Sequence, residues 1–169
     1  MDQLFPFPIS GLSAQPAIET ALEMQLPCSS LLDNALEASA SLGNAAANTA
    51  LAWLFGAQHC HYFQNNPPLV TKLYKRAAEQ GYPVAMTSYG IKLLRGEGTA
   101  NNPYTGTAYL LNAAISGWDD AGLFLAEHIF LGINAKYGLD VAQLFYAEFR
   151  HNAHNEELIE SVENLLAKH

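Results

Sequence analysis

His59, Cys60 and His61 are the residues of this sequence whose types and spacing come closest to a metal site or a nucleophilic centre. Successive residues of a helix point about 100° apart, so His59 and His61 would face nearly opposite sides and could not bind one metal ion. Cys60 has neighbouring histidines, but no Asn or Asp follows at a spacing that would orient a nucleophile and its base. The sequence therefore predicts neither a metal site nor a catalytic cysteine.

His151 and His154 form a second candidate pair, because residues three apart can share one helical face. They lie near Glu156 and Glu157 at an expected helix junction, which favours two surface side chains over a site. No nucleophile elbow, phosphate loop or dinucleotide fingerprint occurs, and the Gly-Glu-Gly run at 96–98 lacks the strand and the further glycine that such a fingerprint needs. We therefore expect no enzymatic activity and no cofactor.

The composition is that of a single folded domain. Half of the 169 residues are hydrophobic and 14% are charged, which is enough apolar surface for a core, and no run of about 18 apolar residues would span a membrane. The first basic residue is Lys72, so the basic start of an export signal is missing. Cys28 and Cys60 are too few for a disulfide framework. These features predict a cytoplasmic protein with reduced cysteines.

The charge is negative but unevenly distributed. A net charge of −8 disfavours binding to nucleic acid or to an anionic membrane, because both need a basic footprint. Residues 72–95 nevertheless hold five basic side chains against the single acid Glu79. This basic stretch is either a surface for an acidic partner or a solvated helix face.

A repeat of 36 residues organises the middle of the chain. Residues 77–81 (AAEQG) recur as residues 113–117 (AAISG), Gly43 begins an earlier unit, and the pattern fades at Ala153. Four residues after each glycine stands an alanine, followed at i+4 and i+8 by large apolar residues on one helical stripe. These stripes are Ala47, Leu51 and Phe55, then Ala85, Tyr89 and Leu93, then Ala121, Leu125 and Ile129. Gly90 or Ala126 beside a stripe would let a neighbouring helix approach closely.

Glycine and proline mark the expected helix boundaries. Gly81 and Gly117 suit the left-handed conformation that ends a helix, and Pro83 can open the next helix, where its missing N–H is not needed. Loops are expected by composition at 65–68 and 96–103. We therefore predict helices at about 17–25, 30–42, 45–62, 68–80, 84–95, 104–116, 119–131, 139–152 and 155–168, the last one capping the exposed end of the repeat.

The block from Ala85 to Gly117 resembles the Sel-one-like repeat (SLR), a relative of the tetratricopeptide repeat. In that repeat Ala, Leu-Gly, Tyr and Gly-x-Gly precede a helix that ends Ala-Ala-Glu-Gln-Gly. Here residues 89–90 (YG) stand for Leu-Gly and residues 96–98 (GEG) for Gly-x-Gly. Residues 74–82 (YKRAAEQGY) are close to the helix ending. The resemblance is strong over 68–132, weaker over 43–67 and 133–153, and absent from 1–29. Phe149 and Arg150 replace the expected Ala-Ala, so we expect the third helix pair to splay or twist.

The resemblance implies an all-α fold, a right-handed α/α superhelix of about three helix pairs with extra N-terminal helices and a C-terminal cap. We expect one domain made of an extended segment (1–16), N-terminal helices (17–42), three repeats (43–80, 81–116 and 117–153) and a cap helix (154–169). The alternating prolines of residues 4–9 predict extended backbone. That apolar segment could pack over the chain's own surface, covering Trp53, or against a partner.

In such a superhelix the first helix of each pair lines a concave groove, and SLR proteins mostly serve as adaptors. The resemblance thus implies a bacterial, cytoplasmic, non-enzymatic module that binds a protein or peptide rather than nucleic acid or membrane. The register predicts these groove residues: Thr49, Trp53, Thr87, Ile91, Arg95, Leu123 and Glu127, with Ala57 and Leu131 at positions equivalent to Arg95.

Two alternative functions remain open at this point. A neutralising partner of a toxin or secreted effector would also be small, acidic and helical. An SLR-fold hydrolase or a cell-wall-fragment binder is less favoured, because the repeated cysteine pairs of SLR proteins that bind cell-wall fragments or β-lactams are missing here.

Overall fold

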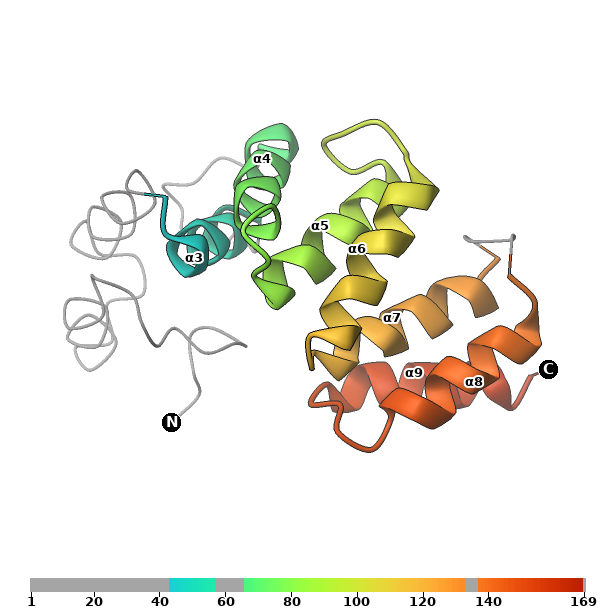
Figure 1. The fold of residues 1–169 in the computed structure, drawn as a ribbon. Coiled ribbons are helices and arrows are strands. Elements are labelled where there is room, and N and C mark those ends of the chain that lie inside the picture. The colour runs from blue at the N-terminus through green and yellow to red at the C-terminus, as the bar shows by residue number, and fades with distance from the viewer. Residues whose placement is uncertain (1–42, 57–65, 133–136, 169) are drawn as a thin grey trace. The chain divides into compact units, whose positions relative to one another are not determined.

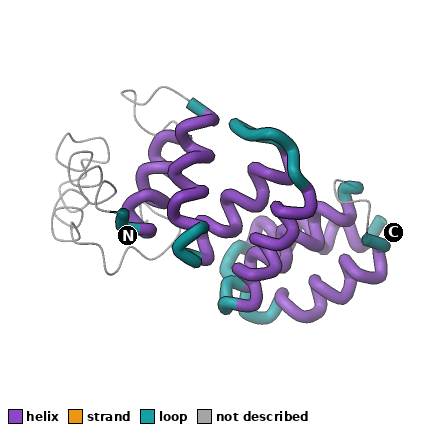
Figure 2. Tube along the Cα trace, turned by 45° about the horizontal axis from the view of Figure 1, so that its top comes forward, coloured by secondary structure: helices purple, strands orange, loops and turns teal. Residues whose placement is uncertain are grey.

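Helices make up most of the described chain. A computed structural model describes residues 43–56, 66–132 and 137–168, and no strand occurs in these ranges (Figure 1 and Figure 2). The helices are α3 (Ala45–Gly56), α4 (Pro67–Ala78), α5 (Pro83–Arg95), α6 (Pro103–Ile115), α7 (Asp119–Phe130), α8 (Leu139–Phe149) and α9 (Glu156–Leu166). The predicted all-α repeat fold is confirmed. The segments expected at 1–16, 17–25 and 30–42, and the histidine–cysteine cluster at 59–61, lie outside the described residues.

The described residues pack into two units, which divide between Ala85 and Met86 in the first turn of α5. In the first unit α3 packs against α4. In the second unit α7 is the central helix and packs against α6, α8 and α9 (Figure 1). The division into three repeats within one domain stays a prediction.

The predicted apolar stripes of the first helices form the core. Ala47 and Leu51 of α3 are buried in the first unit. In the second unit the ring of Tyr89 meets that of Tyr109 edge-on, with the ring centroids 5.0 Å apart. The other buried members of the stripes are Ala85, Leu93, Ala121, Leu125 and Ile129. The period of the apolar residues therefore identified the packed face of each first helix.

The second helices of the first two repeats begin in the same way. Asn66 and Asn102, which are 36 residues apart, precede α4 and α6, and their side chains accept hydrogen bonds from backbone N–H groups in the first turn. Proline follows each of them, where its missing N–H costs nothing. Gly138 stands at the equivalent place before α8 and offers no side-chain cap.

The same two helices also end alike. Gly81 and Gly117 have φ of +78° and +90°, as predicted for residues that terminate a helix. The next residue in each case, Tyr82 or Trp118, donates its N–H back to the carbonyl of Ala77 or Ala113. This is the Schellman arrangement, which satisfies carbonyls that would otherwise lack partners at the helix end.

We expect Gly117→Val to lower the free energy of unfolding by about 1–2 kcal/mol, because a β-branched residue tolerates positive φ badly. A Cβ at this position would meet no atom within 4 Å, so the loss comes from the backbone rather than from a clash. Chemical denaturation measures it, with Ala108→Val on the exposed side of α6 as the control for valine in a helix. An unchanged midpoint for Gly117→Val would contradict this account of the helix end.

α5 and α6 approach each other closely at two glycines. A Cβ on Gly90 would lie 2.9 Å from the carbonyl oxygen of Gly106, and a Cβ on Gly106 would lie 2.8 Å from that of Gly90. Both contacts are with backbone, so neither position can accept a side chain without moving a helix. The close approach expected beside the first-helix stripe is therefore confirmed at Gly90.

The third helix pair accommodates a large residue where the other repeats have alanine. Phe149 of α8 occupies the position of Ala113 in α6, and its size predicts helices that splay or twist there. In the structure its ring lies over Gly122 of α7, at the place where a Cβ of residue 122 would have been. The equivalent of Gly122 in the preceding repeat is the larger residue Met86. Gly122 therefore supplies room for the ring.

Candidate functional site

Three of the seven predicted groove residues are buried and cannot present a surface to a partner. Thr49 and Leu123 are fully buried and Thr87 is 4% exposed. These three occupy the same repeat position, so the correction applies to a whole row of the predicted groove. The physical reason is that a repeat period shows which residues share a face, but not whether neighbouring helices cover that face.

The other four predicted residues reach the surface to different extents. Trp53 in the first unit and Ile91 and Glu127 in the second are half-buried, and Arg95 is exposed. Leu131, the equivalent of Arg95, is 51% exposed. Along α5, and again along α7, one stripe thus passes from buried to half-buried to exposed in steps of four residues. The accessible part of this stripe in α5 and α7 is therefore its C-terminal end.

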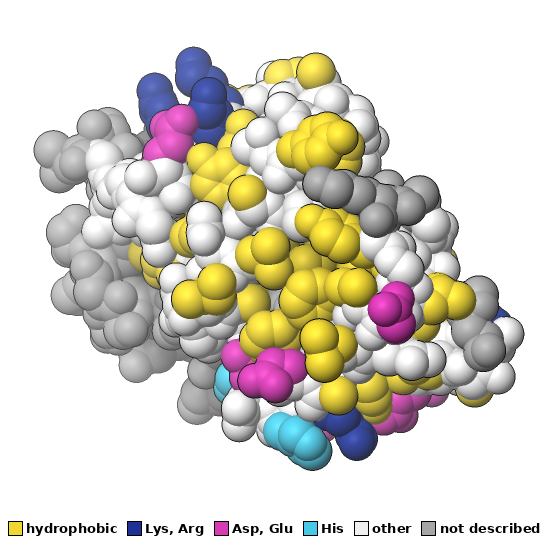
Figure 3. Space-filling model, turned by 45° about the vertical axis from the view of Figure 1, so that its right-hand side comes forward, with side chains coloured by type: hydrophobic (Ala, Val, Ile, Leu, Met, Phe, Trp, Pro, Cys, Tyr) yellow, Lys and Arg dark blue, Asp and Glu magenta, His cyan; other side chains and the backbone are white. Residues whose placement is uncertain are grey.

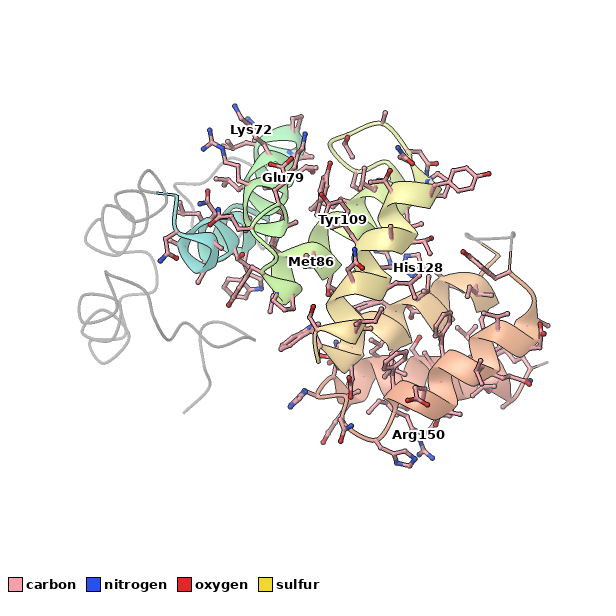
Figure 4. All side chains as sticks on the ribbon, viewed as in Figure 1. Lys72, Glu79, Met86, Tyr109, His128 and Arg150 are labelled. Carbon is pink, nitrogen blue, oxygen red and sulfur yellow. The ribbon has the colours of Figure 1, made fainter. Side chains whose placement is uncertain are left out.

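Arg95 is held by a buried histidine that no sequence motif indicates. His128 of α7, labelled in Figure 4, is fully buried. Its Nε2 accepts a hydrogen bond from Nε of Arg95 at 3.3 Å. Its Nδ1 lies 2.7 Å from the carbonyl oxygen of Phe124. Since the arginine nitrogen can only donate, the imidazole is neutral, with its proton on Nδ1 shared with that carbonyl. The pair links α5 to α7.

Burial lowers the pKa of His128 below its ordinary value of 6.5, and the positive charge of Arg95 lowers it further. The hydrogen bond to the Phe124 carbonyl and the carboxylates of Glu127 and Glu97 raise this pKa, but not enough to offset burial. His128 is therefore a neutral hydrogen-bond acceptor at neutral pH.

We expect the free energy of unfolding to fall as the pH drops below about 6.5, by up to 1.4 kcal/mol per pH unit for this one residue. In that range the unfolded chain binds a proton at His128 that the folded chain does not bind. The loss should level off below the folded-state pKa. Denaturant unfolding of wild type and His128→Gln between pH 7.5 and 5 measures the difference, with the exposed His154→Gln as control. Parallel curves for wild type and His128→Gln would contradict the prediction.

Glu127 makes a second link, from α7 to α9. Its Oε1 accepts a hydrogen bond from the hydroxyl of Ser161 in α9 at 2.7 Å. Arg95 and Glu127 thus connect α7 to the helices on either side, α5 through His128 and α9 through Ser161. These two hydrogen bonds tie the C-terminal end of α7 to the end of α5 and to the middle of α9.

The described residues contain no group of three His, Cys, Asp or Glu side chains that could hold a metal ion. His151 and His154, the second candidate pair, are both exposed, and the ring of His154 stacks on Trp118 with 6.1 Å between centroids. None of the helices in the described ranges has the length and hydropathy needed to cross a membrane.

The basic stretch of the sequence divides between two surfaces. Lys72, Lys75 and Arg76 are exposed on α4, where basic side chains form a cluster in Figure 3. Lys75 lies 3.7 Å from Glu79, and both side chains are more than half exposed, so this ion pair adds little stability. Lys92 and Arg95 at the end of α5 share Glu97 instead. This second group includes Arg95, one of the predicted groove residues.

Solved structures of two bacterial proteins share this fold. A Sel1 repeat protein from Oxalobacter formigenes matches with a TM-score of 0.58 and 20% identity, over 76% of this chain and 95% of that one. The protein c5321, a protective antigen of uropathogenic Escherichia coli strains that displays an SLR fold, matches with a TM-score of 0.63 and 14% identity. That match covers 82% of this chain and 33% of the antigen, so this chain spans about a third of its length.

No family model matches the sequence, and no curated protein is similar to it. At identities of 14% and 20%, the two structural matches establish the fold and nothing finer. The SLR resemblance seen in the sequence is confirmed at that level.

Proposed function

We propose that this chain, which has the fold of Sel1 repeat proteins, is a non-enzymatic module that binds a protein or peptide through its first helices. The observation that carries the proposal is Arg95, an exposed arginine whose side chain is held by a hydrogen bond to the buried His128, one helical turn from the half-buried Ile91. Arginine and large apolar side chains are the residues that most often anchor interfaces. An arginine that is already fixed loses less conformational entropy on binding than a freely rotating one.

The partner surface that we propose comprises Ile91, Arg95 and Glu127 of the second unit, and Trp53 is proposed as a separate contact on the first unit. Among these, Glu127 is already bound to Ser161, so it contributes mainly to the rigidity of the surface. We propose a bacterial, cytoplasmic setting. The net charge of −8 also favours the second candidate, a neutralising partner of a toxin or effector, if the bound protein is basic.

Co-purification from the native host followed by mass spectrometry would identify the partner and distinguish the two candidates. With the partner in hand, Arg95→Glu should weaken binding, and the effect should shrink at high salt because part of it is electrostatic. Arg150→Glu is a matched control, since the two arginine side chains are 41% and 42% exposed and both lie near a glutamate. Equal losses from both variants would show that net charge, not this surface, determines binding.

Trp53→Ala should weaken partner binding by about 2 kcal/mol, as the loss of an aromatic anchor typically does. Because Trp53 is half-buried, the far-ultraviolet helical signal should be preserved. Isothermal titration and circular dichroism measure the two effects on the same samples. If Trp53→Ala instead unfolds the chain and leaves the affinity of the remaining folded fraction unchanged, Trp53 belongs to the core and must be removed from the proposed surface.

A further inference from the structure

Arg95 projects from the last turn of α5 with its guanidinium divided between two partners. Nε donates to Nε2 of His128 at 3.3 Å, and Nη1 lies 3.9 Å from Oε1 of Glu97. The arginine side chain is 41% exposed, whereas the histidine is fully buried. A guanidinium held through Nε keeps its two terminal nitrogens for other partners; one of them lies near Glu97, and together they form a fork that matches the two oxygens of a carboxylate.

We propose that His128 is a positioning residue, whose neutral ring orients Arg95 to bind a carboxylate of the partner and whose protonation releases Arg95 in mild acid. This inference rests on the proposed function, because it assigns partner chemistry and regulation to the same surface. It concerns a carboxylate-bearing segment of a protein, such as a glutamate or aspartate side chain.

Protonation of His128 would replace an attraction by a repulsion. The incoming proton binds Nε2, the ring nitrogen that accepts from Arg95, so two donors and two positive charges then face each other. The ring cannot turn away easily, since Nδ1 is anchored to the carbonyl oxygen of Phe124 within α7. The guanidinium can move, because it is partly in solvent already. Arg95 is therefore the group that leaves, and it turns toward Glu97.

Few charged groups surround this pair among the described residues. Those that act on the His128 ring are Arg95 from α5, Glu97 from the loop after α5, and Glu127 from α7 itself. Glu97 lies 3.3 Å from Lys92, and Glu127 is bound to Ser161. The sequence of α6 contains no charged residue. Since the pKa of His128 is lowered by burial, the release should occur below pH 6.5.

The positioning step can be tested on the full chain without a partner. At pH 7.5 the Nε–H of Arg95 should exchange with water about fivefold more slowly than that of Arg76, the protection expected from one hydrogen bond. Arg76 is exposed and has no ion pair among the described residues, so it reports a free guanidinium. Nitrogen-15 NMR follows both signals and the ring nitrogens of His128 in one titration. Protection of Arg95 should disappear as His128 protonates, while Arg150, which is paired with Glu163, stays unchanged.

Two substitutions distinguish the effect of the hydrogen bond from the effect of protonating His128. His128→Gln can keep an acceptor near Nε2 but cannot titrate, so Arg95 should stay protected down to pH 5. His128→Leu has no acceptor, so Arg95 should exchange like Arg76 at every pH. Protection that persists in wild type after His128 has titrated would overturn the proposal, as would full protection in His128→Leu. Should the leucine variant fail to fold, the wild-type titration still decides.

A small carboxylate tests the binding step separately from any partner protein. N-acetylglutamate methylamide, added at pH 7.5, should shift the Arg95 signal at least about threefold more than the Arg76 signal, because a bidentate contact needs an oriented guanidinium. The neutral N-acetylglutamine methylamide is the matched control and should shift neither. The larger shift of the Arg95 signal should disappear at pH values below the one at which His128 titrates, and it should be absent in His128→Leu at every pH. Equal shifts at Arg95 and Arg76 would refute the carboxylate site, whereas failure of the proposed function would appear only in partner capture with Arg95→Glu.

Discussion

Gly122→Ala is expected to destabilise the chain by about 1–2 kcal/mol, although alanine is the better helix former by roughly 1 kcal/mol. A Cβ on Gly122 would lie 2.1 Å from Cδ2 and 2.4 Å from Cγ of Phe149, far inside van der Waals contact. Because Cγ stands at the base of the side chain, the ring cannot escape by a small rotation. The added methyl group must displace either Phe149 or the backbone of α8.

The sign of this effect should reverse once the ring is removed. In a Phe149→Ala background the methyl group has no ring to displace, so Gly122→Ala should stabilise by about 0.5–1 kcal/mol through helix propensity. The two backgrounds then differ by a coupling energy of about 2 kcal/mol, within the range for residues in contact. Denaturant unfolding of the four proteins gives this energy directly.

Gly56→Ala is the control for the methyl group itself, because a Cβ there would lie 3.6 Å from Val70, an ordinary contact. It should be neutral or slightly stabilising. Should Gly122→Ala stabilise wild type as much as it stabilises Phe149→Ala, the ring does not rest on Gly122. In the preceding repeat the same two positions hold Met86 and Ala113, both buried, with the large residue on the other helix. The third repeat thus also pairs one large residue with one small one, but the large residue, Phe149, is on the second helix instead of the first.

The helices could be predicted from the sequence because their signals are local and repeated. Asn102 and Pro103 mark the start of α6, and Gly117 marks its end with a conformation that other residues rarely adopt. The stripe through Tyr89 and Leu93 identified the packed face of α5 from its spacing alone. Such features depend on residues within a few turns of each other, so one sequence is enough to recognise them.

The contacts that shape the candidate site could not be predicted in the same way. Arg95 and His128 are 33 residues apart, and nothing in either neighbourhood indicates that one will donate to the other. A histidine within the apolar surroundings of Leu125 and Ile129 was the available signal, but it does not identify a partner. Burial of Thr87 depends on which helix covers it, and the period of a repeat does not contain that information.

Asp120→Ala is expected to lower the free energy of unfolding by about 2–3 kcal/mol and to loosen α9 from the rest of the second unit. The carboxylate of Asp120 is buried in the first turn of α7, and its Oδ1 accepts from the backbone N–H groups of His154 and Asn155, at 2.8 and 3.2 Å. Hydrogen bonds to a charged group contribute about 1.5–3 kcal/mol, and their loss would leave two N–H donors unsatisfied. Asn155 is also the N-cap residue of α9, so the same carboxylate positions the residue that starts this helix.

Asp119→Ala is the matched control, because Asp119 lies in the same first turn of α7 and interacts equally with the helix dipole, which accounts for about 0.3–1 kcal/mol. The stability loss of Asp120→Asn should lie between those of Asp119→Ala and Asp120→Ala, because asparagine keeps an acceptor oxygen and loses the charge. Hydrogen exchange separates a local from a global effect: in Asp120→Ala the amides of α9 should exchange faster than those of α5 and α6. Leu158 and Val162 of α9 are buried, so loosening this helix would expose apolar surface at the end of the unit. Equal stability losses for Asp119→Ala and Asp120→Ala would mean that both carboxylates stabilise the chain through the helix dipole, and that Asp120 does not attach α9.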